Sequence, residues 1–214
     1  MRLILASTSP RRREILTLLG VPFDVIAPEF DEQVSPHLAI EEEVLAFAVG
    51  KARSVGSKNP QSLVIGGDTM ISLDGKKIGK PIDQDDAARI LCALAGKTHE
   101  IYTGVAILDG FGGPGMRTVG KVSVTMRPYT EKEIERYLSC DESYDKAGAY
   151  SIQGEGSGLI ESMSGDYLAA VGMPLKPIAD YFTRRGITVP VDCDKLYADE
   201  SYLNWRLFAG SRTI

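Results

Sequence analysis

Hydrophobic and polar positions follow two periods along the first 186 residues, a period of two that is typical of strands and one near 3.6 that is typical of helices. The apolar run at 3–6 predicts a buried strand, and Ser9 followed by Pro10 is typical of a helix N-cap and first turn. Runs at 100–108 and 119–127 predict an antiparallel hairpin. Further strands are predicted at 23–26, 63–65 and 70–73, and further helices at 38–55, 84–95, 130–139 and 174–185. The pattern therefore predicts an α/β fold with a mixed sheet and flanking helices.

Three segments lack either period. Residues 28–36 predict a polar, acidic loop, and the glycine-rich stretch 148–158 is expected to be irregular. Because the composition changes after Gly186, we divide the chain into a domain at 1–186 and a tail of unknown role at 187–214. Large aromatic side chains are rarely left exposed, so we expect those of the tail to pack on the domain, with a second subunit as the alternative. They are Tyr197, Tyr202, Trp205 and Phe208.

Composition narrows the possible partners. With 43% hydrophobic and 25% charged residues, 214 residues can form one sizeable core or two modest lobes. The net charge of −5 argues against broad nucleic-acid binding and favours small anions as ligands of any local basic cluster. Apolar runs fall short of the roughly 20 residues of a membrane span, so we expect a cytoplasmic protein with no membrane partner. Three scattered cysteines indicate neither a disulfide framework nor a zinc site.

The string Ser7-Thr8-Ser9-Pro10-Arg11-Arg12-Arg13 joins the first strand to the first helix. Unpaired N–H groups and the positive end of the dipole at a helix start suit a phosphate. Taken alone, the string fits an ordinary capped helix with a solvated basic turn better than a binding site. Neighbouring residues on a helix are separated by about 100°, so we assign Arg11 and Arg12 to a cleft and Arg13 to solvent.

Asp68 follows an apolar strand and two glycines, which places its carboxylate at a predicted strand end, a usual position for an α/β active site. Alone, such an aspartate is more often a turn or cap residue. Glu32 in the acidic loop, Lys51 late on a helix and Lys80 after a glycine add a carboxylate and two cations. Together these residues supply what phosphoryl chemistry needs: cations for phosphates, and carboxylates for a metal ion and an attacking water.

Other chemistries lack their residues. The two histidines, His37 and His99, have neither metal-ligand nor triad spacing, and His99 is expected to be structural. The P-loop string is missing, and the glycines at 154–158 do not lead from a strand into a helix as a dinucleotide fingerprint does, so we expect a flexible loop there.

A set of short strings, in this order, resembles the Maf family of nucleoside triphosphate pyrophosphatases from about Leu3 to Gly186. The Arg11-Arg12 pair and the 146–154 string are similar to the branch that acts on dTTP and UTP. The strings are Ala6-Ser7-Thr8-Ser9-Pro10-Arg11-Arg12, Asp31-Glu32, Lys51-Ala52, Gly67-Asp68-Thr69, Gly79-Lys80-Pro81, Tyr102-Thr103-Gly104-Val105, Asp145-Lys146-Ala147-Gly148-Ala149-Tyr150-Ser151-Ile152-Gln153-Gly154 and Gly165-Asp166-Tyr167.

The resemblance implies an elongated, ITPase-like mixed α/β fold with two lobes around a central cleft, and hydrolysis of a nucleoside triphosphate to the monophosphate and pyrophosphate. It implies that Asp68 accepts a proton and, with Glu32, holds Mg²⁺ or Mn²⁺. Lys51 and Lys80, together with Glu32, would surround the triphosphate and the metal ion. The residues implied in substrate binding are Ser7, Ser9, Arg11, Arg12, Thr69 and Gln153.

The sequence departs from the family pattern in two places, and the second departure is expected to alter one wall of the cleft. Gly67 stands where alanine is common, and Ala169-Ala170 replaces an asparagine–valine pair. Two alternatives also stay open: a nucleotide-binding regulator of cell division without turnover, and an enzyme acting on modified pyrimidine triphosphates. A homodimer is a further possibility that the sequence leaves undecided.

Overall fold

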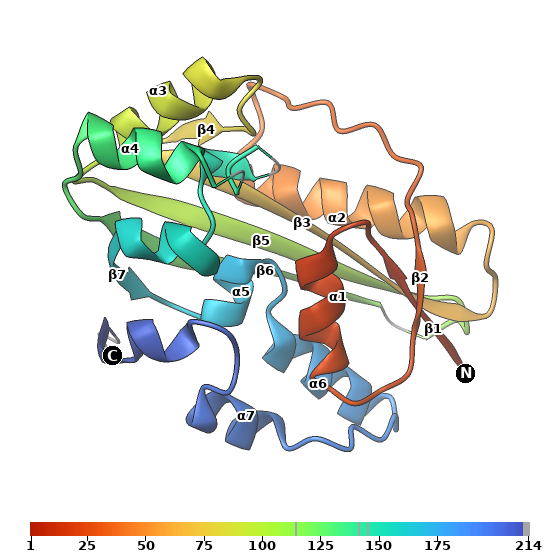
Figure 1. Cartoon of the computed structure of the whole chain (residues 1–214). Coiled ribbons are helices and arrows are strands. Elements are labelled where there is room, and N and C mark those ends of the chain that lie inside the picture. Colours follow the sequence, from red (N-terminus) through yellow and green to blue (C-terminus); the bar gives the residue numbers. More distant parts are fainter. Residues whose placement is uncertain (114, 141, 145, 212–214) are drawn as a thin grey trace.

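A mixed sheet forms the frame of the protein in the computed structural model, which describes residues 1–113, 115–140, 142–144 and 146–211 (Figure 1). Within these residues the sheet has seven strands in the order β2-β1-β3-β5-β6-β7, with β4 paired to β3. Strands β1 and β3 are parallel, as are β1 and β2, and the remaining pairs are antiparallel. The strands are β1 (Arg2–Ala6), β2 (Asp24–Ile26), β3 (Ser62–Leu73), β4 (Lys76–Ile78), β5 (Thr98–Asp109), β6 (Met116–Met126) and β7 (Ile160–Ser164). The predicted mixed α/β fold is confirmed.

Helix starts carry the expected caps. Ser9 accepts from the N–H of Arg12, and Thr130 forms a capping box with Glu133. The stretch 154–158, predicted to be a flexible loop, lies within a short 3₁₀ helix, Gly154–Leu159. The α-helices are α1 (Pro10–Thr17), α2 (Ile40–Gly56), α3 (Gln84–Leu94), α4 (Glu131–Leu138), α5 (Tyr167–Val171), α6 (Leu175–Arg184) and α7 (Cys193–Asp199), and the 3₁₀ helices are η1 (Ala147–Ala149), η2 (Gly154–Leu159) and η3 (Trp205–Ser211).

The two faces of the sheet have different cover. Helix α2 packs on one face, where its apolar residues form clusters with even-numbered residues of β3 such as Val64 and Met70. The opposite face carries the main core, with α1, α5 and α6 at one end and α3 and α4 at the other (Figure 1). Successive residues of a strand point to opposite faces. Neighbouring residues of β3 therefore face different layers, and the two helix groups form the two expected lobes.

Strand β3 is open along part of one edge. Strand β1 pairs with β3 only as far as Gly66, and β4 pairs with it from Ile71. Strand β5 pairs with every residue of β3 from Leu63 to Ser72 on the other edge. The predicted interruption of the strand before Met70 is therefore wrong, because the hydrogen bonds to β5 keep the chain extended through both glycines. Asp68 lies in the middle of a strand rather than at its end, beside the gap between β1 and β4.

The tail packs on the domain, as predicted from its aromatics. Trp205 and Phe208 are buried in the main core and stack on Tyr167, with ring centroids 5.4 and 6.0 Å away. The Tyr197 hydroxyl donates to Asp166 and accepts from the N–H of Leu175. Strand β7 was not predicted, since its five residues follow the glycine-rich stretch directly. Among the described residues, no helix has the length and apolar character needed to cross a membrane.

Candidate active site

A cavity of about 650 Å³ lies at the open edge of β3. Its walls come from the start of α1, the middle of α2 and β3, the end of β4, the segment 146–153 and the end of α5. The described residues that line it include six basic side chains and only two carboxylates: Arg11, Arg12, Lys51, Lys77, Lys80 and Lys146 against Glu32 and Asp68. A protein with a net charge of −5 thus concentrates positive charge in one cavity, as an anion site requires.

Lys51 joins the two carboxylates on the α2 face of the sheet. Its Nζ lies 2.6 Å from Asp68 Oδ1 and 2.5 Å from Glu32 Oε1. Asp68 and Lys51 are both buried, whereas the Glu32 side chain is 44% exposed. Helix α2 comes close enough for this contact because Gly66 has no side chain: a Cβ there would lie 2.2 Å from the Ala48 carbonyl oxygen. The predicted convergence of Asp68, Glu32 and Lys51 is present.

The loop that carries Glu32 is fixed to α2 by two contacts that the sequence did not predict. Phe30 packs edge-to-face on Phe47, with ring centroids 5.7 Å apart. Glu43 is fully buried, accepts from the N–H of Ser35 and forms an ion pair with Lys77 at 2.7 Å. A signal for Glu43 was available, since it lies one helical turn before Phe47 on the buried side of α2. These contacts give the loop a defined position over the cavity.

On the opposite face of the sheet, hydroxyl groups form a directed chain. Arg12 Nη2 donates to Thr69 Oγ1 at 2.9 Å, and Thr69 Oγ1 lies 3.0 Å from Thr103 Oγ1. Thr103 donates its only proton to the Ala169 carbonyl at 2.8 Å, so Thr69 must donate to Thr103. Thr69 therefore has no proton left and offers the cavity an acceptor only. Thr103 belongs to the 102–105 string, but no role had been assigned to it.

Arg12 is fixed by a second hydrogen bond besides the one to Thr69. Its Nε donates to the Gly172 carbonyl at 3.0 Å. Burial lowers the pKa of Arg12 from its ordinary value, the charge of Asp68 opposes this shift, and the charge of Arg11 adds to it. A Cβ at residue 67 would lie 3.2 Å from Arg12 Nε, so Gly67 leaves room for this side chain. Glycine in place of the family's usual alanine at this position therefore leaves more space beside the Arg12 side chain.

The remaining residues of the first string divide as the helix geometry predicts. Arg11 and Arg12 line the cavity, whereas Arg13 is exposed. Ser9 lines it too, while its side chain caps α1. Ser7 does not reach the cavity wall: it is buried behind it and accepts from the N–H of Ser9 at 3.1 Å. The tertiary structure thus gives Ser7 a part in shaping the turn into α1.

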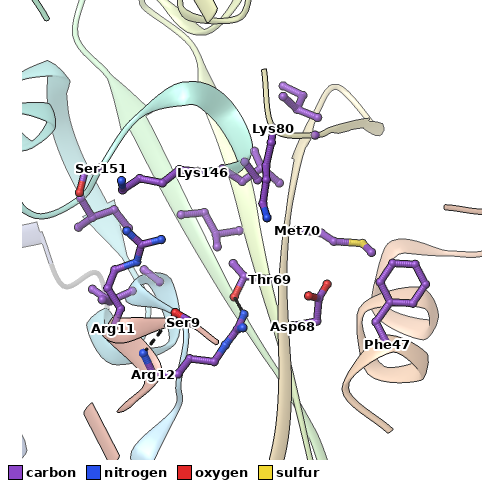
Figure 2. Close-up of a pocket in the computed structure, with 18 of the residues that line it drawn as sticks. Ser9, Arg11, Arg12, Phe47, Asp68, Thr69, Met70, Lys80, Lys146 and Ser151 are labelled. Carbon is purple, nitrogen blue, oxygen red and sulfur yellow. Dashed lines mark hydrogen bonds between the residues drawn. The ribbon is translucent and has the colours of Figure 1, made fainter. Parts of the chain in front are cut away.

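The far wall of the cavity is basic and polar. Figure 2 shows Arg11 and Lys146 extending toward Ser151, and the Lys80 side chain pointing into the space above Asp68. Lys80 follows Gly79, whose carbonyl accepts from the N–H of Gly148 at 3.1 Å, so η1 fixes this segment. Gln153 lines the same wall, and its Nε2 is buried with no hydrogen-bond partner among the described residues. Asp145 of the 145–154 string lies outside the described residues.

The cavity therefore has two sides that carry different functional groups. Asp68, Lys51 and Glu32 form an acid–base group on the α2 side, and Arg12 and Thr69 form a fixed polar surface on the other. No group of three or more His, Cys, Asp or Glu side chains that could hold a metal ion occurs in the described part of the chain. The fold and site define a class: an α/β protein with a strongly basic cavity and a buried carboxylate that is paired with a lysine.

Comparison with known proteins gives the family. The family model described as "Maf-like protein" matches residues 2–185, and the chain belongs to this family. A dTTP/UTP pyrophosphatase of Moorella thermoacetica is 43% identical over 188 residues, which cover 88% of this chain and 97% of that protein. A dTTP/UTP pyrophosphatase of Bacillus cereus is 40% identical over 177 residues, covering 81% and 90%. The Ham1 protein of Staphylococcus aureus overlaps only partly, with a TM-score of 0.43 and 15% identity over 59% of this chain and 72% of that one.

Proposed function

We propose that this protein hydrolyses dTTP, UTP or related pyrimidine triphosphates, including modified ones, to the monophosphate and pyrophosphate. The observation that carries the proposal is the cavity whose lining holds the Asp68–Lys51–Glu32 group together with five further basic side chains. A triphosphate carries the charge that such a cavity balances. The relatives from Moorella thermoacetica and Bacillus cereus are named for this activity.

In the proposed reaction, Asp68 takes a proton from a water molecule while the oxygen of that water attacks the α-phosphorus. The bond from this phosphorus to the oxygen that bridges to the β-phosphorus breaks, and pyrophosphate leaves with the electron pair. Lys51 holds Asp68 Oδ1, which leaves Oδ2 for the water. The basic side chains stabilise the charge that develops on the phosphoryl and leaving-group oxygens, because phosphoryl transfer depends mainly on positioning and electrostatics.

A divalent cation, Mg²⁺ or Mn²⁺, fits the donor set. The carboxylates of Asp68 and Glu32 both pair with Lys51, so they lie close together, and their oxygens that are not paired with Lys51 would hold the ion; carboxylate oxygens are ligands that these ions prefer. Magnesium commonly binds through one or two carboxylates together with substrate phosphates and water. When bound, the ion would neutralise phosphate charge. Treatment with EDTA should abolish turnover, and Mg²⁺ or Mn²⁺ should restore it.

The Thr69 face would bind the base. Thr69 offers only an acceptor, which matches the N3–H of uracil and thymine but not the unprotonated N3 of cytosine. Gln153 lines the same cavity, and its side-chain amide carries both an acceptor and donors that could match the edge of a pyrimidine. A site that hydrogen-bonds a polar group discriminates well against analogues that lack it. Measuring kcat/KM for UTP, CTP and modified uridine triphosphates would define this preference.

Release of pyrophosphate from UTP with Mg²⁺ tests the function itself. The wild-type protein should release it, and Asp68→Asn should lose roughly 100-fold or more in rate while still binding nucleotide, since general bases contribute about 10² to 10⁴. Binding of UTP without product by the wild-type protein would favour the regulator instead. A wild-type rate in the Asp68→Asn variant would remove Asp68 from the chemistry. The homodimer and the cytoplasmic location stay predictions.

A further inference from the structure

We propose that Thr103 is a positioning residue for base selection: it fixes the direction of the hydrogen bond at Thr69 and so makes the site prefer bases of the uracil type to cytosine. The inference deepens the proposed function and rests on it, because Thr69 discriminates between bases only if a base lies against it. Thr103 is fully buried and lies behind Thr69, which lines the cavity. Thr103 therefore acts through Thr69 and does not touch the ligand itself.

The hydrogen bonds of Thr103 have a defined direction. Thr69 on β3 and Thr103 on β5 are direct partners in the antiparallel ladder, and their hydroxyl oxygens lie 3.0 Å apart. On its other side, Thr103 Oγ1 lies 2.8 Å from the carbonyl oxygen of Ala169 in α5. Two oxygens at this distance share a proton, and a carbonyl has none to give. The single proton of Thr103 is therefore directed away from Thr69.

The chain of hydrogen bonds cannot reverse, because each end is fixed by the chemistry of its last group. At one end the Ala169 carbonyl can only accept from Thr103. At the other end the Arg12 guanidinium can only donate: its Nε donates to the Gly172 carbonyl and its Nη2 donates to Thr69 Oγ1. Thr69 consequently accepts from Arg12, donates to Thr103 and keeps one lone pair for a ligand.

This restriction is what distinguishes the two kinds of pyrimidine. Uracil and thymine carry an N–H at position 3, whereas the N3 of cytosine has no proton. A Thr69 hydroxyl that was free to rotate could accept from the first or donate to the second, so the hydroxyl alone selects neither. With its proton held by Thr103, Thr69 would present a lone pair to cytosine N3. Leaving a buried polar group unpaired costs more than a typical hydrogen bond contributes, so Thr103 supplies the preference.

The test compares kcat/KM for UTP and CTP in Thr103→Val. Valine has nearly the same shape but no hydroxyl, and the Ala169 carbonyl keeps its hydrogen bond from the N–H of Gly172. The proton of Thr69 could then turn toward the cavity, so kcat/KM for CTP should rise and the UTP:CTP ratio should fall by roughly 10-fold or more. A loss of stability would lower the activity on both nucleotides together and would not produce this gain for CTP.

Two further variants show whether the hydroxyl and its partner are responsible. Thr103→Ser keeps the hydroxyl and should keep the ratio close to that of the wild-type protein. Thr69→Val removes the group through which Thr103 acts, so adding Thr103→Val to it should not change the ratio further, as a double-mutant cycle would show. Thr98→Val is the matched control. Thr98 Oγ1 lies 2.9 Å from Thr125 Oγ1 in an exposed threonine pair on the same strand, and its loss should leave the ratio unchanged.

Three outcomes would overturn the inference: an unchanged ratio in Thr103→Val, an equally large change in Thr103→Ser, or ratio changes that simply add when Thr103→Val is combined with Thr69→Val. A failure of the proposed function is recognised separately, because the wild-type protein would then release no pyrophosphate from any nucleotide. In that event the same variants are compared by equilibrium binding of UTP and CTP. A gain in CTP binding relative to UTP in Thr103→Val would support the role of Thr103, and an unchanged preference would exclude it.

Discussion

Lys51 Nζ lies 2.6 Å from Asp68 Oδ1, and this contact between two buried residues connects the middle of α2 to the middle of β3. A buried charge is tolerated when it is paired and is costly when its partner is removed. The pair therefore holds Asp68 Oδ1 in place at the wall of the cavity. Four predictions follow from this contact and from its surroundings.

Replacing Lys51 with methionine should leave Asp68 buried without its cation. Deleting one partner of a buried ion pair leaves the other charge uncompensated and no longer held in place. We expect kcat to fall by roughly 100-fold or more. Lys58→Met is the matched control, since Lys58 pairs with Glu29 on the exposed surface. A Lys51→Met variant with the wild-type kcat would contradict the assignment.

Glu43→Gln should loosen the loop that carries Glu32. The change removes the charge that pairs with Lys77 inside the protein, and breaking a buried pair destabilises by about 3–5 kcal/mol when one partner is deleted outright. Glutamine keeps the shape, so we expect a smaller loss, of about 1–3 kcal/mol, together with faster proteolysis within residues 28–38. Urea denaturation measures the first effect. The exposed neighbour Glu42→Gln should change neither quantity.

The adjacent glycines of β3 should respond differently to alanine. At Gly66 a Cβ would lie 2.2 Å from the Ala48 carbonyl oxygen and 2.7 Å from the Ala52 nitrogen, so α2 would have to move. We expect Gly66→Ala to destabilise by about 3 kcal/mol or more. At Gly67 the Cβ would lie closest to the Arg12 side chain, at 3.2 Å, and would be in ordinary contact with the Gly104 carbonyl oxygen at 3.6 Å. Gly67→Ala should keep its Tm and change KM by a few-fold at most; equal losses in Tm would contradict this reading of the two faces.

Stability should fall in acid because of His99. Burial lowers the pKa of His99 to about 4 in the folded protein, against 6.5 ordinarily. Between these values the unfolded chain binds a proton that the folded protein does not, so stability is complete above pH 6.5 and declines as the pH falls toward 4. The expected loss is about 3 kcal/mol. Urea denaturation at pH 7 and pH 4 should show a smaller difference for His99→Gln, and an unchanged one for the exposed His37→Gln.

Much of the site could be predicted because it depends on local sequence. The N-cap and the helical repeat place Arg11 and Arg12 on a different side of α1 from Arg13, and this does not depend on which segment the helix packs against. The family strings marked Asp68, Lys51 and Glu32, and the structure brings these residues together. The sequence could not show Thr103 as the acceptor for the Thr69 proton, because that pairing depends on the register between β3 and β5.

The sequence by itself determined the order and type of most of the longer elements, the hairpin of β5 and β6, and the packing of the tail's aromatics on the domain. These features follow from the local periodicity of apolar residues and from their transfer out of water. Only the tertiary structure decided that β3 continues through Gly66 and Gly67, that β7 forms, and that Tyr202 reaches Glu14. Each of these depends on which distant segment becomes a neighbour, and the hydrogen bonds that the neighbour supplies can override the preference of the local sequence.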